Sequence, residues 1–151
     1  MKAVVQRVAQ GKVTVGGEVL GEIQSGLVVL LGIEQGDGDD EAKWMANKIA
    51  HLRVFADEDS KFNRSLLDVA GQVLLISQFT VCGDARKGRR PSFSSAAPPE
   101  VAEPLMEHVA ELLEEHGVHV ERGQFQAHML VEIHNDGPVT IVVEKRPAKQ
   151  R

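Results

Sequence analysis

Four short apolar runs, separated by glycine-containing pairs, open the chain and restrict its fold more than any other feature of the sequence. The runs cover residues 4–8, 12–15, 19–23 and 27–33, and the pairs between them are Gln10-Gly11, Gly16-Gly17 and Ser25-Gly26. Runs of this length, rich in β-branched residues and bounded by turn formers, are typical of neighbouring strands. The first thirty residues therefore predict a meander of antiparallel strands.

Two later segments have the apolar spacing of helices. Ala42, Met45, Ala46, Ile49 and Leu52 recur at helical intervals, which predicts a helix over about residues 41–52. Asp39 or Asp40 is available as its N-cap. A second amphipathic helix is predicted to open at Pro99-Glu100 and to end before Gly117.

The remaining apolar runs predict further strands and complete the fold. They cover residues 53–55, 73–79, 118–121, 129–134 and 139–144, with an irregular stretch at 56–63. Strands gathered at both ends of the chain around two helices predict an α+β fold, an antiparallel curved sheet or barrel-like β core with two covering helices. With 151 residues, 42% of them hydrophobic, the chain is the size of a single domain over residues 1–151.

Cysteine content and hydropathy bear on the compartment. The longest apolar stretch, residues 27–33, is far shorter than the roughly 20 residues of a membrane span, and the first residues lack a signal-peptide pattern. Cys82 is the only cysteine, so no internal disulfide can form. These features predict a soluble, cytoplasmic protein with no membrane partner. Cys82 itself is either a thiol nucleophile or a small buried hydrophobe.

The net charge of −5 argues against broad electrostatic binding to nucleic acid but leaves room for a local site. One stretch, residues 83–91, concentrates basic side chains with only Asp84 opposing them. Its cations are Arg86, Lys87, Arg89 and Arg90. This stretch is either a phosphate-contacting loop or a solvated surface loop. The basic residues of the tail, from Lys145 to Arg151, are either a second RNA contact or a solubilising end.

Several common kinds of site find no support in the sequence. The six histidines match no zinc spacing, and no acidic cluster repeats with the geometry of a calcium loop. No glycine-rich loop of the nucleotide-binding types is present. We therefore predict no metal and no cofactor. Ser77 lacks the G-x-S-x-G surroundings of a serine hydrolase.

Two short motifs carry the chemistry that the sequence does suggest. Ser77, Gln78, Phe79 and Thr80 end an apolar run, so polar groups emerge where a buried strand leaves the core. The pair Gly137-Pro138 lies between two β-rich runs, where a strand-to-strand turn would expose backbone carbonyls and no bulky side chain. A surface of that kind can sense stereochemistry.

Together these motifs resemble the signature pair of the D-aminoacyl-tRNA deacylases. Four further segments resemble the family in the same order, at residues 1–8, 26–33, 48–58 and 87–93, so the resemblance spans residues 1 to about 144. The departures are Val81, where the family often has Leu, Arg89, where Asn is common, and Gln126, where Gly or Ala is usual. The last of these would narrow the mouth of the pocket.

The resemblance implies hydrolysis of the ester that joins a D-amino acid, or glycine, to the 3′-terminal adenosine of tRNA. It also implies a homodimer in which a cis Gly137–Pro138 peptide enters the active site of the partner subunit. The carbonyls of Gly137 and Pro138 would lie where an L side chain must project and would exclude it.

The resemblance further implies roles for individual residues. The segment from Ser77 to Thr80 would form the catalytic pocket, with backbone N–H groups near Phe79 and Thr80 holding the substrate carbonyl or its adenosine. Arg7 would support the Gly-Pro loop, and Phe93 and Met129 would line the pocket. No general base is visible beside Thr80, and the resemblance assigns much of the catalysis to the 2′-hydroxyl of the tRNA.

Two other kinds of function stay open at this point. The first is a non-catalytic tRNA- or RNA-binding module that uses the basic loop and cleaves no ester. The second is a hydrolase for small D-amino acid esters or peptides that needs no RNA. Removal of the substrate 2′-hydroxyl distinguishes the second from the tRNA-dependent reaction.

Overall fold

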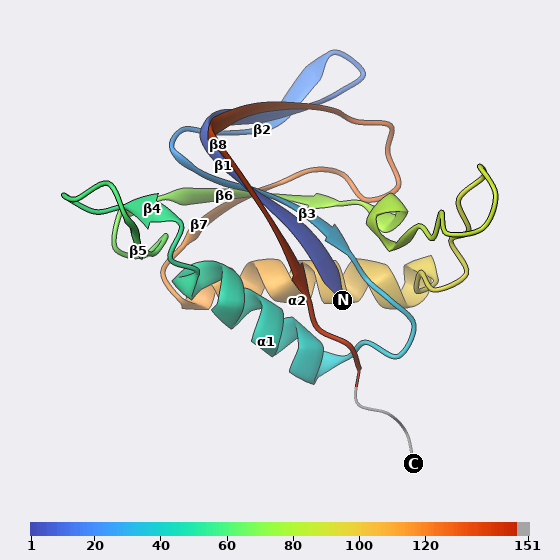
Figure 1. Cartoon of the computed structure of the whole chain (residues 1–151). Helices are drawn as coiled ribbons and strands as arrows, with labels where there is room; N and C mark the ends of the chain where they lie inside the picture. Colours follow the sequence, from blue (N-terminus) through green and yellow to red (C-terminus); the bar gives the residue numbers. More distant parts are fainter. Residues whose placement is uncertain (148–151) are drawn as a thin grey trace.

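The computed structural model describes residues 1–147, which form a strongly curved sheet covered on one face by two long helices (Figure 1). In chain order the elements are β1 (Lys2–Val15), β2 (Glu18–Ile23), β3 (Gly26–Gly32), α1 (Asp39–His51), β4 (Phe55–Ala56), β5 (Phe62–Arg64), β6 (Gln72–Ser77), the 3-10 helix η1 (Phe79–Cys82), α2 (Pro99–Glu115), β7 (His119–Arg122) and β8 (Leu130–Glu144). The predicted α+β class with two covering helices is confirmed.

The main sheet is mixed, which corrects the prediction of an antiparallel one. Its order is β2-β1-β3-β6-β7, and β8 pairs with β1. The pairs β3–β6 and β6–β7 are parallel, whereas the partners of β1 are all antiparallel to it. The cause lies in the connections, because α1 lies between β3 and β6 and α2 between β6 and β7. A helical crossover returns the chain to the same end of the sheet and makes the next strand parallel.

Strand β1 runs unbroken through Gly11, where the sequence predicted a turn between two strands. Gly11 pairs with Ile23 of β2 and with Ile133 of β8. A Cβ atom at this position would lie 2.8 Å from Cγ2 of Val28, closer than side chains tolerate. Gly11 therefore permits a close approach inside the curled sheet rather than a reversal of the chain.

Strand β8 is also one strand, so the predicted hairpin turn at Gly137-Pro138 is wrong. Both halves of β8 pair with β1, but the register breaks where Gln6 lies opposite Thr140 and Val8 lies opposite Asn135. Two steps along β1 thus match five along β8, and the residues between Asn135 and Thr140 bulge out of the ladder. Bulges of this kind bend a strand and redirect its backbone groups.

Two apolar cores hold these layers together. The larger lies between the sheet and the helices and contains alternate residues of β1, such as Ala3 and Val5, with Met45 and Ile49 of α1. The smaller fills the inside of the curl. Asp39, predicted as a possible N-cap, instead pairs with Lys43 and with His108 of α2, and so links the two helices.

Two short elements differ from the predicted secondary structure. The stretch expected to be irregular, residues 56–63, overlaps the antiparallel β4–β5 hairpin, and the strand predicted over residues 53–55 coincides with β4 only at Phe55. The strand predicted to reach Phe79 ends at Ser77, and a 3-10 helix follows. Within the described part of the chain, no helix has both the length and the apolar character that a membrane crossing requires.

Candidate active site

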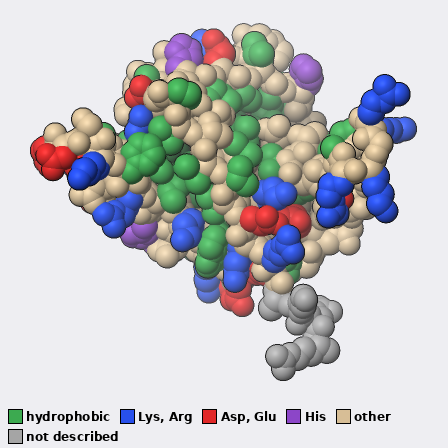
Figure 2. All heavy atoms as spheres, viewed as in Figure 1, with side chains coloured by type: hydrophobic (Ala, Val, Ile, Leu, Met, Phe, Trp, Pro, Cys, Tyr) green, Lys and Arg blue, Asp and Glu red, His purple; other side chains and the backbone are tan. Residues whose placement is uncertain are grey.

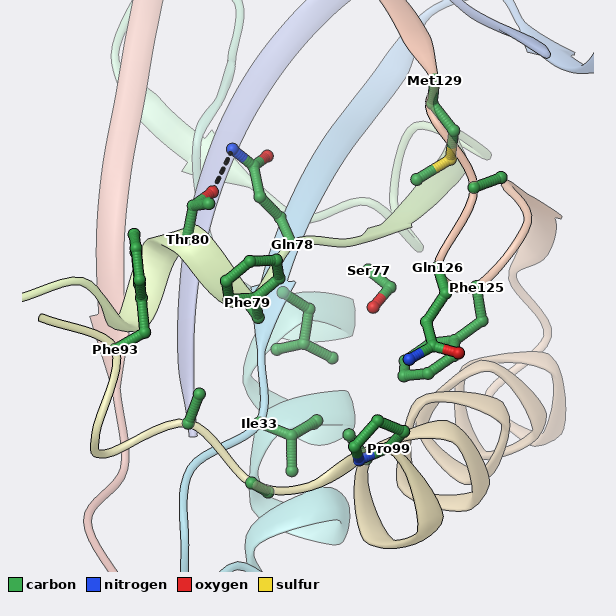
Figure 3. Close-up of a pocket in the computed structure, with 15 residues that line it drawn as sticks. Ile33, Ser77, Gln78, Phe79, Thr80, Phe93, Pro99, Phe125, Gln126 and Met129 are labelled. Carbon is green, nitrogen blue, oxygen red and sulfur yellow. Dashed lines mark hydrogen bonds between the residues drawn. The ribbon is translucent and has the colours of Figure 1, made fainter. Parts of the chain in front are cut away.

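A cavity of about 640 Å³ opens beside η1, at the carboxyl ends of the parallel strands β3 and β6 (Figure 3). Ser77, Gln78, Phe79 and Thr80 all line it, and so do Phe93 and Met129. The remaining lining residues are Leu31, Ile33, Ala96, Ala97, Pro99, Ala102, Phe125, Gln126 and Ala127. The structure thus brings the predicted pocket motif together with both of its predicted lining residues.

The position of the motif follows from the end of a buried strand. Residues 73–76 of β6 are buried between the two cores, and Ser77 is the first residue of the run that reaches the cavity. The N–H of Gln78 still donates to the carbonyl of Leu31, at 2.9 Å, and this bond extends the β3–β6 ladder by one step. The chain then turns into η1, at the edge of the sheet where ligands of parallel sheets usually bind.

The exposed part of the motif is ordered by contacts among its own side chains. Nε2 of Gln78 donates to Oγ1 of Thr80 at 3.1 Å (Figure 3). The ring of Phe79, which is 57% exposed, meets the ring of Phe93 edge to face, with 5.2 Å between centroids. An aromatic face at the mouth of an apolar cavity can pack against a flat ligand group.

No side chain of residues 1–147 that lines this cavity is ionisable, and this fact constrains the chemistry of the cavity. The lining offers hydroxyl and amide groups but no carboxylate, imidazole or amine. Thr80 therefore has no general base within the cavity to activate it as a nucleophile. Among the described residues, no group accepts a hydrogen bond from the backbone N–H of Phe79 or of Thr80, and both are free to donate to a ligand.

Cys82 acts as a buried apolar residue rather than as a thiol nucleophile. It is 5% exposed, and its Sγ lies 3.8 Å from the carbonyl oxygen of Ile33. Burial, with a further effect from the charge of Glu34, raises the pKa of the Cys82 thiol. A thiol that stays protonated and enclosed neither attacks an ester nor reaches the cavity.

Gln126 lines the mouth of the cavity with its backbone in the left-handed region, at φ 64°. A side chain in this region costs about 1–2 kcal/mol, a strain that glycine avoids. We expect Gln126→Gly to stabilise the fold by about 0.5–1 kcal/mol, because the greater freedom of glycine in the unfolded chain offsets part of the relief. Urea unfolding measures the change.

Gln124→Gly is the matched control for this substitution. Gln124 belongs to the same exposed segment but is absent from the non-glycine residues with positive φ. It should lose stability by the ordinary entropic cost of glycine. Equal losses in the two variants would contradict the strain at Gln126.

The Gly137–Pro138 loop is the second predicted element of the site, and it protrudes from the sheet. The peptide bond between the two residues is cis, φ of Gly137 is 132°, and both residues are exposed. Nε of Arg7 donates to the carbonyl of Asp136 at 3.0 Å, and Nη1 of Arg7 donates to the carbonyl of Val54 at 2.8 Å. Arg7 thus ties the loop to the segment before β4.

A second set of contacts closes the loop from the side of β8. Oδ1 of Asn135 accepts the N–H of Val139 at 3.0 Å, and Nδ2 of Asn135 donates to Oγ1 of Thr140 at 3.0 Å. The loop is also packed closely against Arg7. A Cβ atom on Gly137 would lie 2.9 Å from Nη2 of Arg7.

Within one chain the loop does not form part of the cavity. Neither Gly137 nor Pro138 lines the cavity. In Figure 1 the bend of β8 lies toward the left of the view, as the β4–β5 hairpin does, whereas η1 lies to the right, beyond the end of β6. The predicted site residues therefore divide into a pocket group and a loop group that includes Arg7.

The basic cluster forms a projecting loop whose base is closed by the bridge between Asp84 and Ser92 (Figure 2). Arg86 is engaged with Asp84, at 2.7 Å, and its hydrogen bonds lower the pKa of Asp84 to about 2. Lys87, Arg89 and Arg90 are exposed on the same loop. In the tail, Arg146 pairs with Glu144, while Lys149 and Arg151 lie outside the described residues.

Part of the cavity wall had no signal in the sequence. Ile33 follows β3, Pro99 and Ala102 belong to α2, and Phe125 lies between β7 and β8. These apolar residues are indistinguishable from core residues until the fold brings their segments together. Phe125 is partly buried and also packs against the main core, so even in the structure it serves both the cavity wall and ordinary packing.

Comparison with known proteins agrees with this geometry. A family model described as D-Tyr-tRNA(Tyr) deacylase matches residues 4–144. The D-aminoacyl-tRNA deacylase of Heliobacterium modesticaldum is 59% identical over 146 residues, which is 97% of each chain. That of Thermus aquaticus is 60% identical over 144 residues, which is 95% of each chain.

Two solved structures share the fold. The c-Myc DNA Unwinding Element Binding Protein matches with a TM-score of 0.91 and 43% identity, covering 97% of this chain and 99% of its own. A probable eukaryotic D-amino acid tRNA deacylase matches with a TM-score of 0.78 at 16% identity, which shows the common fold alone. The near-complete family match and the high identity lead to one conclusion. The chain belongs to the D-aminoacyl-tRNA deacylases, hydrolases that act on ester bonds.

Proposed function

We propose that this protein hydrolyses the ester between a D-amino acid and the 3′-terminal adenosine of tRNA, and that it rejects L-aminoacyl-tRNA. The observation that carries the proposal is the pairing of an apolar cavity without ionisable side chains with an exposed, rigidly held Gly137–Pro138 loop. The first suits a reaction that the substrate assists. The second suits discrimination by shape.

In the proposed reaction the cavity binds and orients the end of the tRNA. The exposed ring of Phe79 offers a face to the terminal base, and the free N–H groups of Phe79 and Thr80 point to an oxyanion site. The terminal ribose 2′-hydroxyl promotes the hydrolysis, and the protein contributes position. Ser77, Gln78 and the Thr80 hydroxyl complete the polar edge of the pocket.

In this proposal chiral selection uses the loop of a second subunit, which is supported by the fact that Gly137 and Pro138 do not line the cavity of their own chain. In the proposed homodimer, the Gly137 and Pro138 carbonyls enter the partner cavity and occupy the space of an L side chain. An apolar face is available for such an association. Leu30, Val4 and Val142 are neighbours across β3, β1 and β8, and Val142 is 65% exposed.

Selection by exclusion also determines how glycine is treated. A glycyl ester has no side chain to clash with the carbonyls of Gly137 and Pro138. Glycyl-tRNA is therefore a substrate in this proposal, and its protection must come from elsewhere. The natural setting of the reaction is the cytoplasm, where aminoacyl-tRNA is made and used.

The exposed basic loop is proposed to contact tRNA phosphates. We expect replacement of Lys87, Arg89 and Arg90 together by alanine to weaken tRNA binding and to flatten its dependence on salt. Each lost phosphate contact should reduce the slope of log K against log salt by about 0.7–0.9. Titration of labelled tRNA at several salt concentrations measures both effects.

Arg86→Ala is the matched control in the same loop. Its guanidinium is already occupied by Asp84. It should change the salt slope less than any of the other three cations. An unchanged slope in the triple variant would mean that the loop is only a solvated surface.

The direct test of the proposed function compares release of a D- and an L-amino acid from the same tRNA by the purified protein, with a metal chelator present. Rapid release of the D form alone is the expected result. Binding of tRNA without cleavage would favour the RNA-binding module instead. Release of both forms would refute the proposed role of Gly137 and Pro138.

A further inference from the structure

The ring of Phe62 is unusually exposed for a large apolar residue. It belongs to β5 at the edge of the molecule, and its side chain is 55% exposed. The main core does not account for it, because Phe62 is not among the residues that form or line either core cluster. The ring has a charged neighbour instead. The guanidinium carbon of Arg7 lies over the ring of Phe62, 5.6 Å from the ring centroid.

This contact joins Phe62 to the Gly137–Pro138 loop through a single side chain. The same guanidinium donates to the carbonyl of Asp136, directly before Gly137, and to the carbonyl of Val54, before β4. Two hydrogen bonds fix the plane of the guanidinium. The ring lies close enough to the guanidinium for a cation–π attraction, which adds a third contact to the two hydrogen bonds.

The backbone that presents Phe62 is itself held firmly. Oδ1 of Asp57 accepts the N–H groups of Asp59, at 2.8 Å, and of Lys61, at 3.1 Å. On the other side of Phe62, Nε of Arg53 donates to the carbonyl of Asn63 at 3.0 Å. Because these hydrogen bonds fix the backbone on both sides of Phe62, its ring can hold the Arg7 guanidinium in place.

We infer that Phe62 is a positioning residue, whose ring holds the Arg7 guanidinium against the Asp136 carbonyl and thereby fixes the carbonyls of Gly137 and Pro138. The effect of Phe62 on chiral selection rests on the proposed function, because the position of the loop matters only if the loop discriminates between substrates. The effect of Phe62 on Arg7 is independent of the proposed function. Phe62 acts through Arg7 and takes no part in the chemical step.

The first experiment measures the ratio of D to L release in a series of Phe62 variants. Phe62→Ala should reduce this ratio about threefold to fivefold, the usual size of an exposed cation–π contact. Phe62→Tyr and Phe62→Trp should keep the ratio close to that of the unmodified protein. Phe62→Leu retains apolar bulk without an aromatic face and should resemble Phe62→Ala. A Leu variant equal to the unmodified protein would overturn the inference.

The second experiment reads Arg7 directly and needs no substrate. In the ¹⁵N NMR spectrum of the free protein, the Nε–H of Arg7 should exchange with water several times faster in Phe62→Leu than in the unmodified protein. Arg64→Ala is the control, because Arg64 lies in the same hairpin and pairs with Glu58 rather than with Arg7. Equal exchange in all three proteins would refute the positioning role.

These two readouts separate failure of the inference from failure of the proposed function. If the unmodified protein released no D-amino acid while Arg7 exchange still depended on Phe62, the proposed function would fail and the positioning role would stand. If D release were strong and selective in every Phe62 variant, the proposed function would stand and the inference would fail.

Discussion

Substitution of Gly137 by alanine is expected to reduce release of D-amino acids about 100-fold and to remove most discrimination between D and L substrates. The added Cβ would lie 2.9 Å from Nη2 of Arg7 and 2.8 Å from Cγ2 of Val139, so either the loop or the guanidinium must move. Gly137 also has φ 132°, which side chains rarely adopt. A shift of about 1 Å at a reacting centre costs about 100-fold in rate.

The measurement is single-turnover release from D- and L-aminoacyl-tRNA, beside circular dichroism to show that the variant is folded. Unfolding is not the expected cause, because Gly137 and Pro138 are exposed and belong to neither core cluster. Val19→Ala, on the exposed part of β2, is a suitable control for an apolar surface change away from the loop. A folded Gly137→Ala protein with unchanged rate and selectivity would refute the proposed role of the loop.

Mixing experiments reveal whether the loop acts across subunits. Ala127→Trp should block the cavity from its mouth, since Ala127 lines it. Gly137→Ala then has an open cavity but a displaced loop, and Ala127→Trp has an intact loop but a blocked cavity. Each variant alone should therefore have little activity. If the partner supplies the loop, a mixture of the two proteins regains activity, because the mixed dimer contains one intact cavity that faces one intact loop. Subunit exchange must first be demonstrated. A mixture that exchanges subunits but regains no activity would contradict the shared site.

The second large effect concerns the substrate rather than the protein. A tRNA that ends in 2′-deoxyadenosine should be deacylated about 1,000-fold more slowly, within the usual range for loss of a positioned acid–base group. Thr80→Ala, by contrast, should keep its rate within about tenfold. The physical reason is that no ionisable side chain lines the cavity to activate Thr80.

The assay is single-turnover hydrolysis at saturating protein, which separates the chemical step from binding. The nonspecific hydrolysis of each ester without protein provides the baseline. A Thr80→Ala variant that is folded, binds tRNA and has only baseline activity would establish Thr80 as the nucleophile. Full activity on the 2′-deoxy substrate would favour the hydrolase that needs no RNA.

The sequence predicted the pocket better than it predicted the sheet, for a physical reason. The polar residues Ser77, Gln78 and Thr80 follow the buried part of a strand, and that boundary is visible in local hydropathy. The direction of β6 relative to β3 is a property of the connection between them, which local hydropathy does not encode. The mixed sheet therefore appeared only in the structure.

Glycine produced the two wrong turns in the prediction. Gly11 and Gly137 both lie between β-rich runs, and each was interpreted as a break between strands. In the structure the first lies inside β1, where a neighbouring side chain leaves no space for a Cβ, and the second lies in a bulge within β8. Sequence shows that a glycine is present but not whether the chain reverses there or is approached closely.

The division of the site into two groups could not be predicted from residue patterns at all. Arg7 and Gly137 are 130 positions apart, yet antiparallel pairing of β1 with β8 makes them neighbours. Thr80 lies nearer to both along the chain, but it lines the cavity and they do not. Only the family resemblance, with the homodimer that it implies, suggested that the two groups act together.

A cavity without ionisable side chains also determines how the enzyme responds to acidity. Since no lining group gains or loses a proton, the protein has no pH optimum of its own to impose on the chemical step. The pH dependence of the hydrolysis rate should instead be set by the substrate and the solvent, through the α-ammonium group of the ester and the concentration of hydroxide. While tRNA binding is unchanged, the enzymatic rate and the spontaneous decay of the ester should then rise and fall together with pH, so the ratio of the two rates should stay the same.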